Sequence, residues 1–384
     1  MTSTLDDRST VDLTTPATTV TPRLELSVTR ALEGYDALAS TLPGTAVHYA
    51  VKANPHPVLL RALALAGGRF DVASRAETEL CLAAGASPED LVFSNPVKRR
   101  TDVESAARSG VRLFVVDSPE ETRKVAEAAP GARVLCRLVT SGEGSDWPLS
   151  RKFGCSTGEA VAVLRLAASL GLDPTGVSFH VGSQQHDPLA WRAPIDAAAR
   201  IFETLRADGL HPHVVDLGGG FPAAHEGTAP PLHCYAAAIH SFLGHAFGAG
   251  LPDTLIEPGR GVVGDAGTLV TRVIAVLRRG DVRWVYLDCG VFGGLVETLG
   301  EAIRYRLATP GLDGPTGPCV LAGPTCDSTD VMYERTPVRL PLALAEGDEV
   351  HLQSAGAYTS CYSTVGFNGF PPLATVLTRP GPPR

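Results

Sequence analysis

Lysine is scarce in this sequence. Of its 33 basic residues only four are lysines, namely Lys52, Lys98, Lys124 and Lys152. The 41 acidic residues outnumber the basic ones, and the formal net charge is -8. A negative field of this kind disfavours nucleic acid or an acidic membrane surface as a partner. The sequence also has no apolar run of the length that a transmembrane helix needs.

The eight cysteines lack any pairing that would indicate a special role. They are scattered without a Cys-x-x-Cys or Cys-x-His spacing, so neither a metal site nor a disulfide framework is expected. Residues 1–20 are rich in Ser, Thr and Asp and contain no apolar segment of the kind found in secretory signals. We therefore expect residues 1–21 to be a disordered lead-in, and the chain to be cytoplasmic with reduced cysteines.

Apolar runs alternate with helical patterns through most of the chain. Helical patterns fill most of the gaps between the runs, and several of them end at a glycine, as helix C-termini prefer. Eight strand-helix repeats are typical of a TIM-like (β/α)8 barrel, which needs about 250 residues. The sequence therefore predicts an α/β fold with a barrel over residues 29–264. The eight expected strands are Val47–Ala53, Phe70–Ala73, Leu91–Ser94, Leu113–Val116, Val134–Val139, Val177–Val181, Val214–Leu217 and Leu255–Glu257.

The pattern changes after Gly264. Short β-type runs separated by Gly, Pro and Asp follow, such as Thr268–Leu277, Val282–Leu287 and Glu349–Leu352. Residues 265–384 are therefore expected to form a C-terminal β domain. The strand-like segment 22–28 precedes the barrel, and we expect it to join this β domain.

Lys52 stands at the end of the first expected barrel strand, in the stretch His48–Pro55. Burial favours the neutral amine and lowers a lysine pKa unless the ammonium is paired. A neutral amine can form a Schiff base with an aldehyde, which arginine cannot. The alternative is that Lys52 only reaches solvent along its aliphatic stem.

Polar residues or glycines lie at or just after the C-terminal ends of six of the eight expected strands. In a barrel of this type the catalytic residues come from the C-terminal ends of the strands. A purely structural barrel would not need them there, although any single one has a structural explanation. They are Lys52, Asp71 and Ser74, Arg137, His180 and Ser183, Gly218, Gly219 and Gly220, and Glu257 and Arg260.

The three glycines after the seventh strand indicate a phosphate site. Without Cβ atoms, their amides can approach an anion closely, and Arg260 follows the eighth strand nearby. A phosphate site combined with a Schiff-base lysine suggests pyridoxal phosphate. Glu257 could then meet the pyridine nitrogen of that cofactor.

Nine motifs resemble those of the fold-type III pyridoxal-phosphate decarboxylases, which act on ornithine, lysine, arginine and diaminopimelate. The resemblance covers nearly all of the chain from Pro22 to Phe370, and it is nearest to the bacterial ornithine/lysine branch. It implies an alanine-racemase-like barrel followed by a β-sandwich or β-barrel domain. The motifs lie at Tyr49–Asn54, Phe70–Glu77, Arg151–Gly154, Phe179–Gln184, Asp216–Pro222, Glu257–Arg260, Gly323–Ser328, Ala355–Thr359 and Gly366–Phe370.

The resemblance implies a role for each site residue. Lys52 would bind pyridoxal phosphate as a Schiff base, His180 would stack on the ring, and Glu257 would pair with the pyridine nitrogen. No metal is implied. The phosphate would be held by Gly218, Gly219, Gly220, Ser183, Arg260 and Tyr358, and the shell around Lys52 and the ring would contain Asp71, Glu77 and Arg137.

The resemblance also implies a homodimer whose two active sites are shared between subunits. Cys326 and Asp327 would reach the site of the partner, where Cys326 would protonate the substrate carbon after CO2 leaves. Asp327, Cys289, Tyr358 and Phe367 would contact the amino-acid substrate.

Cys289 leaves the substrate open. It stands where eukaryotic ornithine decarboxylases place an aspartate for the distal amine. Decarboxylation of L-ornithine or L-lysine to putrescine or cadaverine is the expected reaction. The alternatives are a modified or D-configured diamino acid, or diaminopimelate, in a secondary pathway, and a catalytically silent relative that regulates a partner.

Overall fold

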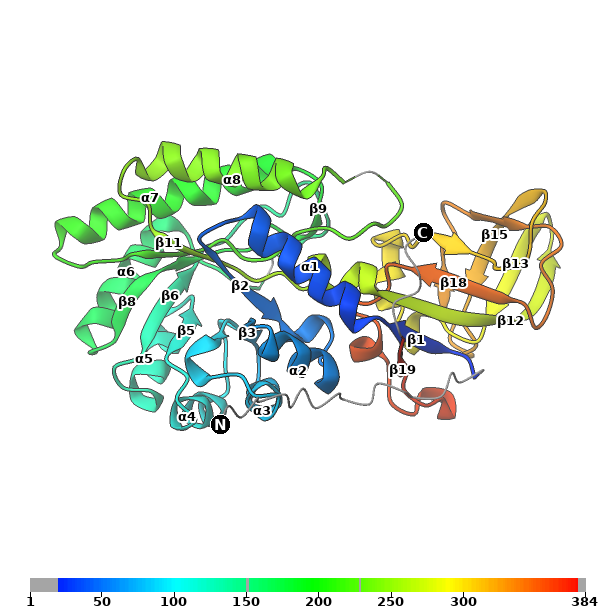
Figure 1. Ribbon diagram of the computed structural model, residues 1–384, viewed down its shortest axis with the longest axis horizontal. Coiled ribbons are helices and arrows are strands. Elements are labelled where there is room, and N and C mark those ends of the chain that lie inside the picture. The colour runs from blue at the N-terminus through cyan, green and yellow to red at the C-terminus, as the bar shows by residue number, and fades with distance from the viewer. Residues whose placement is uncertain (1–19, 150–151, 228, 379–384) are drawn as a thin grey trace, which may run out of the picture.

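The computed structural model describes residues 20–149, 152–227 and 229–378. The expected lead-in therefore lies outside the described residues, apart from its last two positions. Two bodies lie side by side along the long axis of the molecule, with the helix-covered barrel at one end and the β-rich part at the other (Figure 1). Among the described residues, no helix is both long and apolar enough to cross a bilayer.

Eight parallel strands close into a barrel, which confirms the predicted fold class. Every expected barrel strand is present, and its ends differ from the expected ones by a few residues. Strands buried on both faces need continuous apolar runs, and this explains why the sequence signal was clear. In order around the barrel the strands are β10 (Val214–Asp216), β11 (Asp253–Ile256), β2 (Thr45–Ala50), β3 (Arg69–Val72), β4 (Leu91–Phe93), β5 (Leu113–Val116), β6 (Arg133–Arg137) and β8 (Asp173–Ser178).

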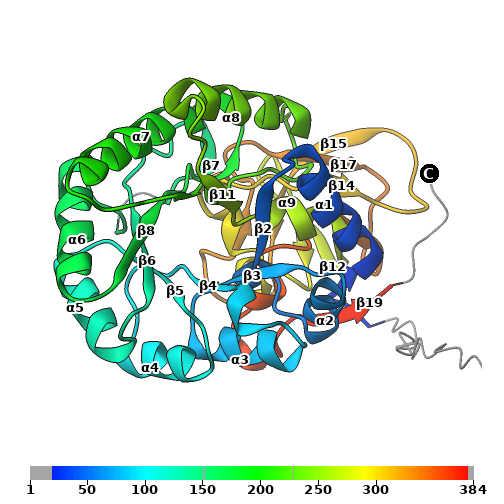
Figure 2. The ribbon, with the colours of Figure 1, turned by 60° about the vertical axis from the view of Figure 1, so that its left-hand side comes forward.

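A ring of helices surrounds the strands (Figure 2). Serines cap several of these helices, and Ser156 forms a capping box with Glu159 at the start of α6. Such a cap stabilises a helix by about 1 kcal/mol. The helices are α1 (Val28–Thr41), α2 (Pro57–Leu65), α3 (Arg75–Ala83), α4 (Arg100–Arg108), α5 (Pro119–Ala128), α6 (Thr157–Ser169), α7 (Arg192–Ala207), α8 (Leu232–Phe247) and the short α9 (Arg260–Val263).

A curled nine-stranded sheet forms the second body. Strand β1 (Arg23–Leu26) pairs antiparallel with β12 (Gly267–Arg279) and parallel with β19 (Ala374–Leu377), so the chain passes through this sheet before it enters the barrel. The remaining strands are β13 (Val282–Leu287), β14 (Leu307–Ala308), β15 (Thr316–Ala322), β16 (Val331–Met332), β17 (Val338–Pro341) and β18 (Glu349–Gln353).

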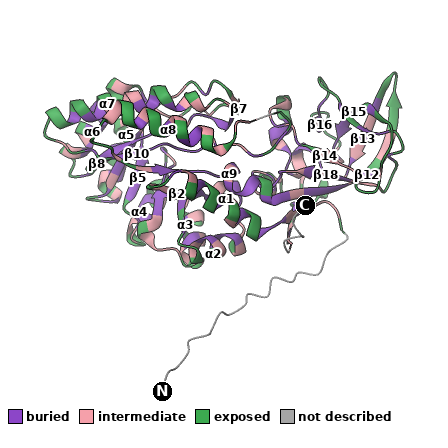
Figure 3. Ribbon diagram, turned by 45° about the horizontal axis from the view of Figure 1, so that its top comes forward, coloured by how far each residue is buried: buried purple, intermediate pink, exposed green. Residues whose placement is uncertain are grey.

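Each body has its own hydrophobic core. Burial follows the barrel strands and the inward faces of the helices, whereas the outer helix faces are exposed (Figure 3). This arrangement leaves the C-terminal ends of the barrel strands to carry polar side chains.

The sequence did not predict one small element at this end of the barrel. Strand β7 (Ser145–Trp147) pairs antiparallel with β9 (Ser183–Gln185), and Trp147 lies opposite Ser183. The segment that follows β6 is thereby held beside the segment that follows β8.

Candidate active site

A cavity of about 450 Å³ lies where the barrel strands end and the second body begins. Most of its lining comes from barrel loops, but Glu297, Tyr358 and Tyr362 come from the second body. The other lining residues are Lys52, Arg137, Trp147, Pro148, Leu149, Lys152, Phe153, His180, Ser183 and Glu257. The structure thus brings together residues that the sequence analysis singled out at separate strand ends.

Lys52 forms an ion pair with Asp71 at the base of this cavity. Asp71 also accepts a hydrogen bond from Ser94. Burial lowers the pKa of Lys52, but the charges of Asp71, Tyr358 and Glu257 outweigh it, so the pKa is raised above the ordinary lysine value. Lys52 is thus the paired case of the two that the sequence left open, because the strand register places the Asp71 carboxylate against the amine.

The turn that carries Lys52 is held by a distant segment of the chain. Asn54 Nδ2 donates to the Gly356 carbonyl (2.9 Å), and the Tyr358 amide donates to the Ala53 carbonyl (2.8 Å). The Cys361 thiol donates to the Lys52 carbonyl at 3.2 Å. The orientation of Lys52 therefore depends on residues about 300 positions later in the chain.

Glu77 lies in the first turn of α3, close to Lys52. Its Oε2 accepts from the Ala73 amide (2.6 Å), and Ser74 caps the same turn. Burial raises the pKa of Glu77, while the Ala73 hydrogen bond and Lys52 oppose that shift. Glu77 thus fixes the segment that follows β3.

His180 is neutral in this site. Its Nδ1 accepts a hydrogen bond from the Gly182 amide (3.0 Å), which leaves the proton on Nε2. Burial and the nearby charges of Arg137 and Lys52 lower the His180 pKa well below its ordinary value. The Arg137 guanidinium itself lies over the Phe153 ring, 5.5 Å from the centroid.

Glu257 and Asp216 are neighbouring buried acids. Asp216 Oδ1 accepts from the Gly218 amide (2.9 Å). Among the described residues, Asp216 Oδ2 and Glu257 Oε1 have no hydrogen-bond partner. Burial raises the pKa of Asp216 to about 7 and that of Glu257 well above its ordinary value, so the pair retains a proton in the free protein.

The three glycines are packed too closely for side chains. A Cβ on Gly219 would lie 2.7 Å from the Glu257 carbonyl oxygen and 2.9 Å from His180 Nε2. Gly218 and Gly220 have positive φ angles of 67° and 112°, which favour glycine. Since the Gly218 amide already donates to Asp216, the predicted phosphate contacts are left to Gly219 and Gly220.

Arg260 lies beside Ser183, Tyr358 and Glu297. Its Nε and NH2 groups donate to Ser183 Oγ (3.3 Å each), and its guanidinium lies over the Tyr358 ring at 5.0 Å. NH2 also donates to both carboxylate oxygens of Glu297, at 2.8 and 2.7 Å. The sequence analysis assigned no role to Glu297.

Two unpartnered buried atoms make this site suitable for pyridoxal phosphate. Among the described residues, Arg260 NH1 is a donor without an acceptor, and Glu257 Oε1 is an acceptor without a donor. A phosphate would satisfy the first, and a protonated pyridine nitrogen would satisfy the second. The residues present therefore fit the cofactor.

Of the predicted substrate residues, Tyr358 lines this cavity, whereas Asp327, Phe367 and Cys289 do not. Cys326 and Asp327 are exposed on the second body, and the Cys326 amide donates to Asn368 Oδ1 (3.0 Å). Phe367 packs against Phe292, with ring centroids 4.6 Å apart, and lines a separate cavity of about 210 Å³.

Cys289 is fully buried in the core of the second body, where its thiol donates to the Gly293 carbonyl (3.5 Å). The structure therefore does not place Cys289 in contact with a substrate in the Lys52 cavity, because this thiol belongs to the packed core.

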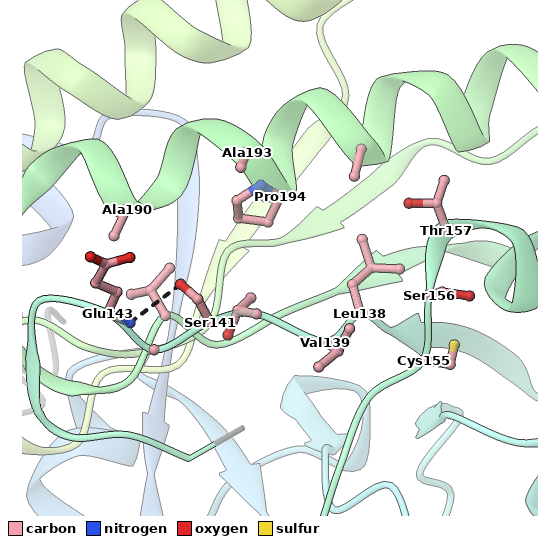
Figure 4. A pocket seen from close by; sticks show the side chains of 14 residues that line it. Leu138, Val139, Ser141, Glu143, Cys155, Ser156, Thr157, Ala190, Ala193 and Pro194 are labelled. Atoms are coloured by element: carbon pink, nitrogen blue, oxygen red, sulfur yellow. Dashed lines mark hydrogen bonds between the residues drawn. The ribbon is translucent and has the colours of Figure 1, made fainter. Parts of the chain in front are cut away.

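A further cavity of about 410 Å³ opens between α7 and the segment after β6 (Figure 4). Leu138, Cys155, Ser156 and Pro194 are among the residues that line it. None of the residues assigned to the cofactor or the substrate lines this cavity, so it is distinct from the Lys52 site.

The barrel, the lysine at its mouth and the anion-binding loops together define a barrel enzyme with a pyridoxal-type site. Residues 29–264 match the family described as "Pyridoxal-dependent decarboxylase, pyridoxal binding domain". The chain belongs to this family.

Named relatives agree with this assignment. The lysine/ornithine decarboxylase of Selenomonas ruminantium is 36% identical over 359 residues, which cover 93% of this chain and 89% of that protein. The crystal structure of lysine/ornithine decarboxylase complexed with putrescine from Vibrio vulnificus has a TM-score of 0.84 at 34% identity, and covers 93% of this chain and 94% of that one. The crystal structure of SrLDC in complex with PLP and cadaverine has a TM-score of 0.84 at 35% identity. The match covers 93% of this chain and 90% of that one.

Proposed function

We propose that this chain uses pyridoxal phosphate to decarboxylate L-ornithine, L-lysine or both, giving putrescine or cadaverine and CO2. The observation that carries the proposal is that Lys52, His180 and Glu257 line one cavity, with Arg260 held against its lining residues Ser183, Glu297 and Tyr358. The Selenomonas and Vibrio relatives support the choice of a basic amino acid.

When bound, pyridoxal phosphate supplies an electron sink for the electron pair left on the α-carbon as CO2 departs. The remaining tasks belong to side chains. Lys52 would provide the amine that binds the cofactor aldehyde, and Asp71 would orient that amine. Glu257 would hold a proton at the pyridine nitrogen, which would maintain the electron sink, and His180 would contact the ring.

Gly219, Gly220, Ser183, Arg260 and Tyr358 would hold the phosphate. Tyr358 adopts a φ of 56°, which residues other than glycine seldom do. The Tyr358 amide donates a hydrogen bond to the Ala53 carbonyl, in the turn that carries Lys52. This backbone conformation therefore links the residues proposed to hold the phosphate to the turn that carries the Lys52 amine.

We also propose a homodimer in which each subunit completes the site of the other. Cys326 and Asp327 are exposed and lie outside the Lys52 cavity of their own chain, which is consistent with a role in the partner. In that role the Cys326 thiol delivers a proton to the substrate α-carbon, and the Asp327 carboxylate pairs with the distal ammonium. We propose a cytoplasmic location, as the sequence pattern suggests.

Release of CO2 from a panel of amino acids tests the proposal. The panel contains L-ornithine, L-lysine, L-arginine, diaminopimelate and the D-isomers, each with the purified protein and pyridoxal phosphate. L-ornithine or L-lysine should give the highest kcat/KM. Preference for a D-isomer or diaminopimelate would refute the proposed substrate, and a colourless protein without CO2 release would indicate a catalytically silent relative.

A further inference from the structure

Glu297 is a buried acid on the wall of the Lys52 cavity. Its carboxylate oxygens both accept from Arg260 NH2, at 2.8 and 2.7 Å, and only about 3% of the Glu297 side chain is exposed. Its charge is therefore directed at the guanidinium that the proposed function assigns to the cofactor phosphate.

Arg260 is equally buried, with about 2% of its side chain exposed. An unpaired guanidinium at this depth would be costly, and Glu297 supplies the counter-charge. NH2 faces Glu297 and Ser183, while NH1 has no partner among the residues that the structure describes. The ion pair thus stabilises the free protein and leaves one edge of the guanidinium open.

A phosphate that binds this open edge enters a site that already contains a carboxylate. Like charges repel strongly where water is excluded, because the effective dielectric constant is low. The phosphate must therefore share Arg260 with Glu297 and bear the repulsion of its charge. Both effects weaken phosphate binding compared with an Arg260 that has no acidic partner.

We propose that Glu297 is a positioning residue that holds Arg260 in place when no phosphate is bound, and that its negative charge limits how tightly the cofactor phosphate binds. This inference rests on the proposed function, since it takes Arg260 as a phosphate ligand. Burial raises the pKa of Glu297, and the charge and hydrogen bonds of Arg260 oppose that shift.

Glu297→Gln is the variant that separates charge from shape. Glutamine retains an acceptor oxygen for Arg260 NH2 and nearly the same volume, but it has no charge. Dissociation constants for pyridoxal phosphate and for pyridoxal would be measured on the cofactor-free full chain by absorbance titration. The Kd of pyridoxal phosphate should fall at least about tenfold, whereas that of pyridoxal should change by less than about threefold.

Thermal unfolding provides a second readout. The cofactor-free Glu297→Gln protein should have a lower Tm than the wild type, because Arg260 loses its counter-charge. Saturating pyridoxal phosphate should raise its Tm by more than it raises that of the wild type.

Two control variants test the interpretation. Glu297→Asp keeps the charge and should retain the wild-type preference for pyridoxal phosphate over pyridoxal. Glu121→Gln removes the charge from another buried ion pair, that of Glu121 with Lys98 at 3.0 Å, which does not line the cavity. It should lower the Tm without changing the ratio of the two dissociation constants.

Unchanged or weaker binding of pyridoxal phosphate by Glu297→Gln would overturn the inference, and so would equal tightening for both ligands. If the glutamine variant does not fold, Glu297→Ala also lacks the charge and should show the same selective tightening. A wild-type chain that binds neither ligand would instead refute the proposed function.

Discussion

The ion pair between Lys52 and Asp71 makes Asp71→Asn an informative variant. Asparagine keeps the size of the side chain and can still accept from Ser94, but it no longer neutralises the ammonium. Removing one member of a fully buried ion pair costs about 3–5 kcal/mol. The Asp71 side chain is 0% exposed, but that of Lys52 is 40% exposed, so water screens part of this loss. We therefore expect the free energy of unfolding of the cofactor-free protein to fall by about 1–3 kcal/mol.

Urea unfolding at pH 7 and pH 9 measures this cost. Because the folded protein raises the pKa of Lys52, the stabilisation is fully present below the ordinary lysine value of about 10.4 and is lost only as the pH rises through the raised pKa. The difference between Asp71→Asn and the wild type should therefore be equal at the two pH values.

The reactivity of Lys52 provides an independent measurement. Without Asp71 the pKa of the amine should fall, so trinitrobenzenesulfonate should modify Lys52 faster at pH 9 in the variant than in the wild type. Asp146→Asn is the matched control, since Asp146 pairs with His186 (2.9 Å) at a part-exposed site. It should cost at most about 1 kcal/mol and leave the reactivity of Lys52 unchanged. If Asp71→Asn altered neither stability nor Lys52 reactivity, the pair would not determine the charge of this lysine.

The remaining predictions concern the cofactor, the shared site and the substrate. Lys52→Ala should abolish turnover and the borohydride-reducible adduct with pyridoxal phosphate, and arginine should not rescue it; an adduct that persists would disprove the assignment. Gly219→Ala should weaken the binding of pyridoxal phosphate while the protein stays folded, because the new Cβ would press against His180 Nε2 and the Glu257 carbonyl. Gly244 has open space around it, so the control variant Gly244→Ala should bind pyridoxal phosphate normally. The variants Lys52→Ala and Cys326→Ala should each be inactive alone, but a mixture that exchanges subunits should recover about a quarter of the wild-type activity. Half of the dimers are then mixed, and each mixed dimer has one intact site of two. No recovery after proven exchange would show that each subunit has a self-contained site. Asp327→Ala should raise the KM for the preferred diamino acid. Losing a charge-assisted hydrogen bond of about 1.5–3 kcal/mol lowers kcat/KM roughly ten- to hundredfold. Unchanged kinetics would exclude Asp327 from the substrate site.

The barrel and the strand-end residues could be predicted from the sequence. Parallel strands that are covered on both faces need continuous apolar runs, and these runs are visible without knowledge of the fold. Once eight of them are recognised, the geometry of the barrel places the residues that follow each strand on one face. Lys52, His180, Glu257 and Arg260 could therefore be assigned to one site from local pattern alone.

The tertiary structure decided the features that depend on contacts between distant segments. The charge of Lys52 follows from the position of Asp71 on the neighbouring strand, which the sequence pattern does not specify. Cys289 occupies a position that the resemblance associates with substrate binding, yet its thiol is packed in the core of the second body. Strand β7 was missed because a three-residue strand has too few positions to show an alternating pattern.

Glu297 is the clearest example of this limit. It lies 37 residues after Arg260 and belongs to the second body, so no sequence spacing relates the two side chains. They meet only because the second body closes over the C-terminal end of the barrel and buries both of them. The sequence by itself determined which residues each strand presents at that end, whereas the packing of the two bodies decided which charges those residues face.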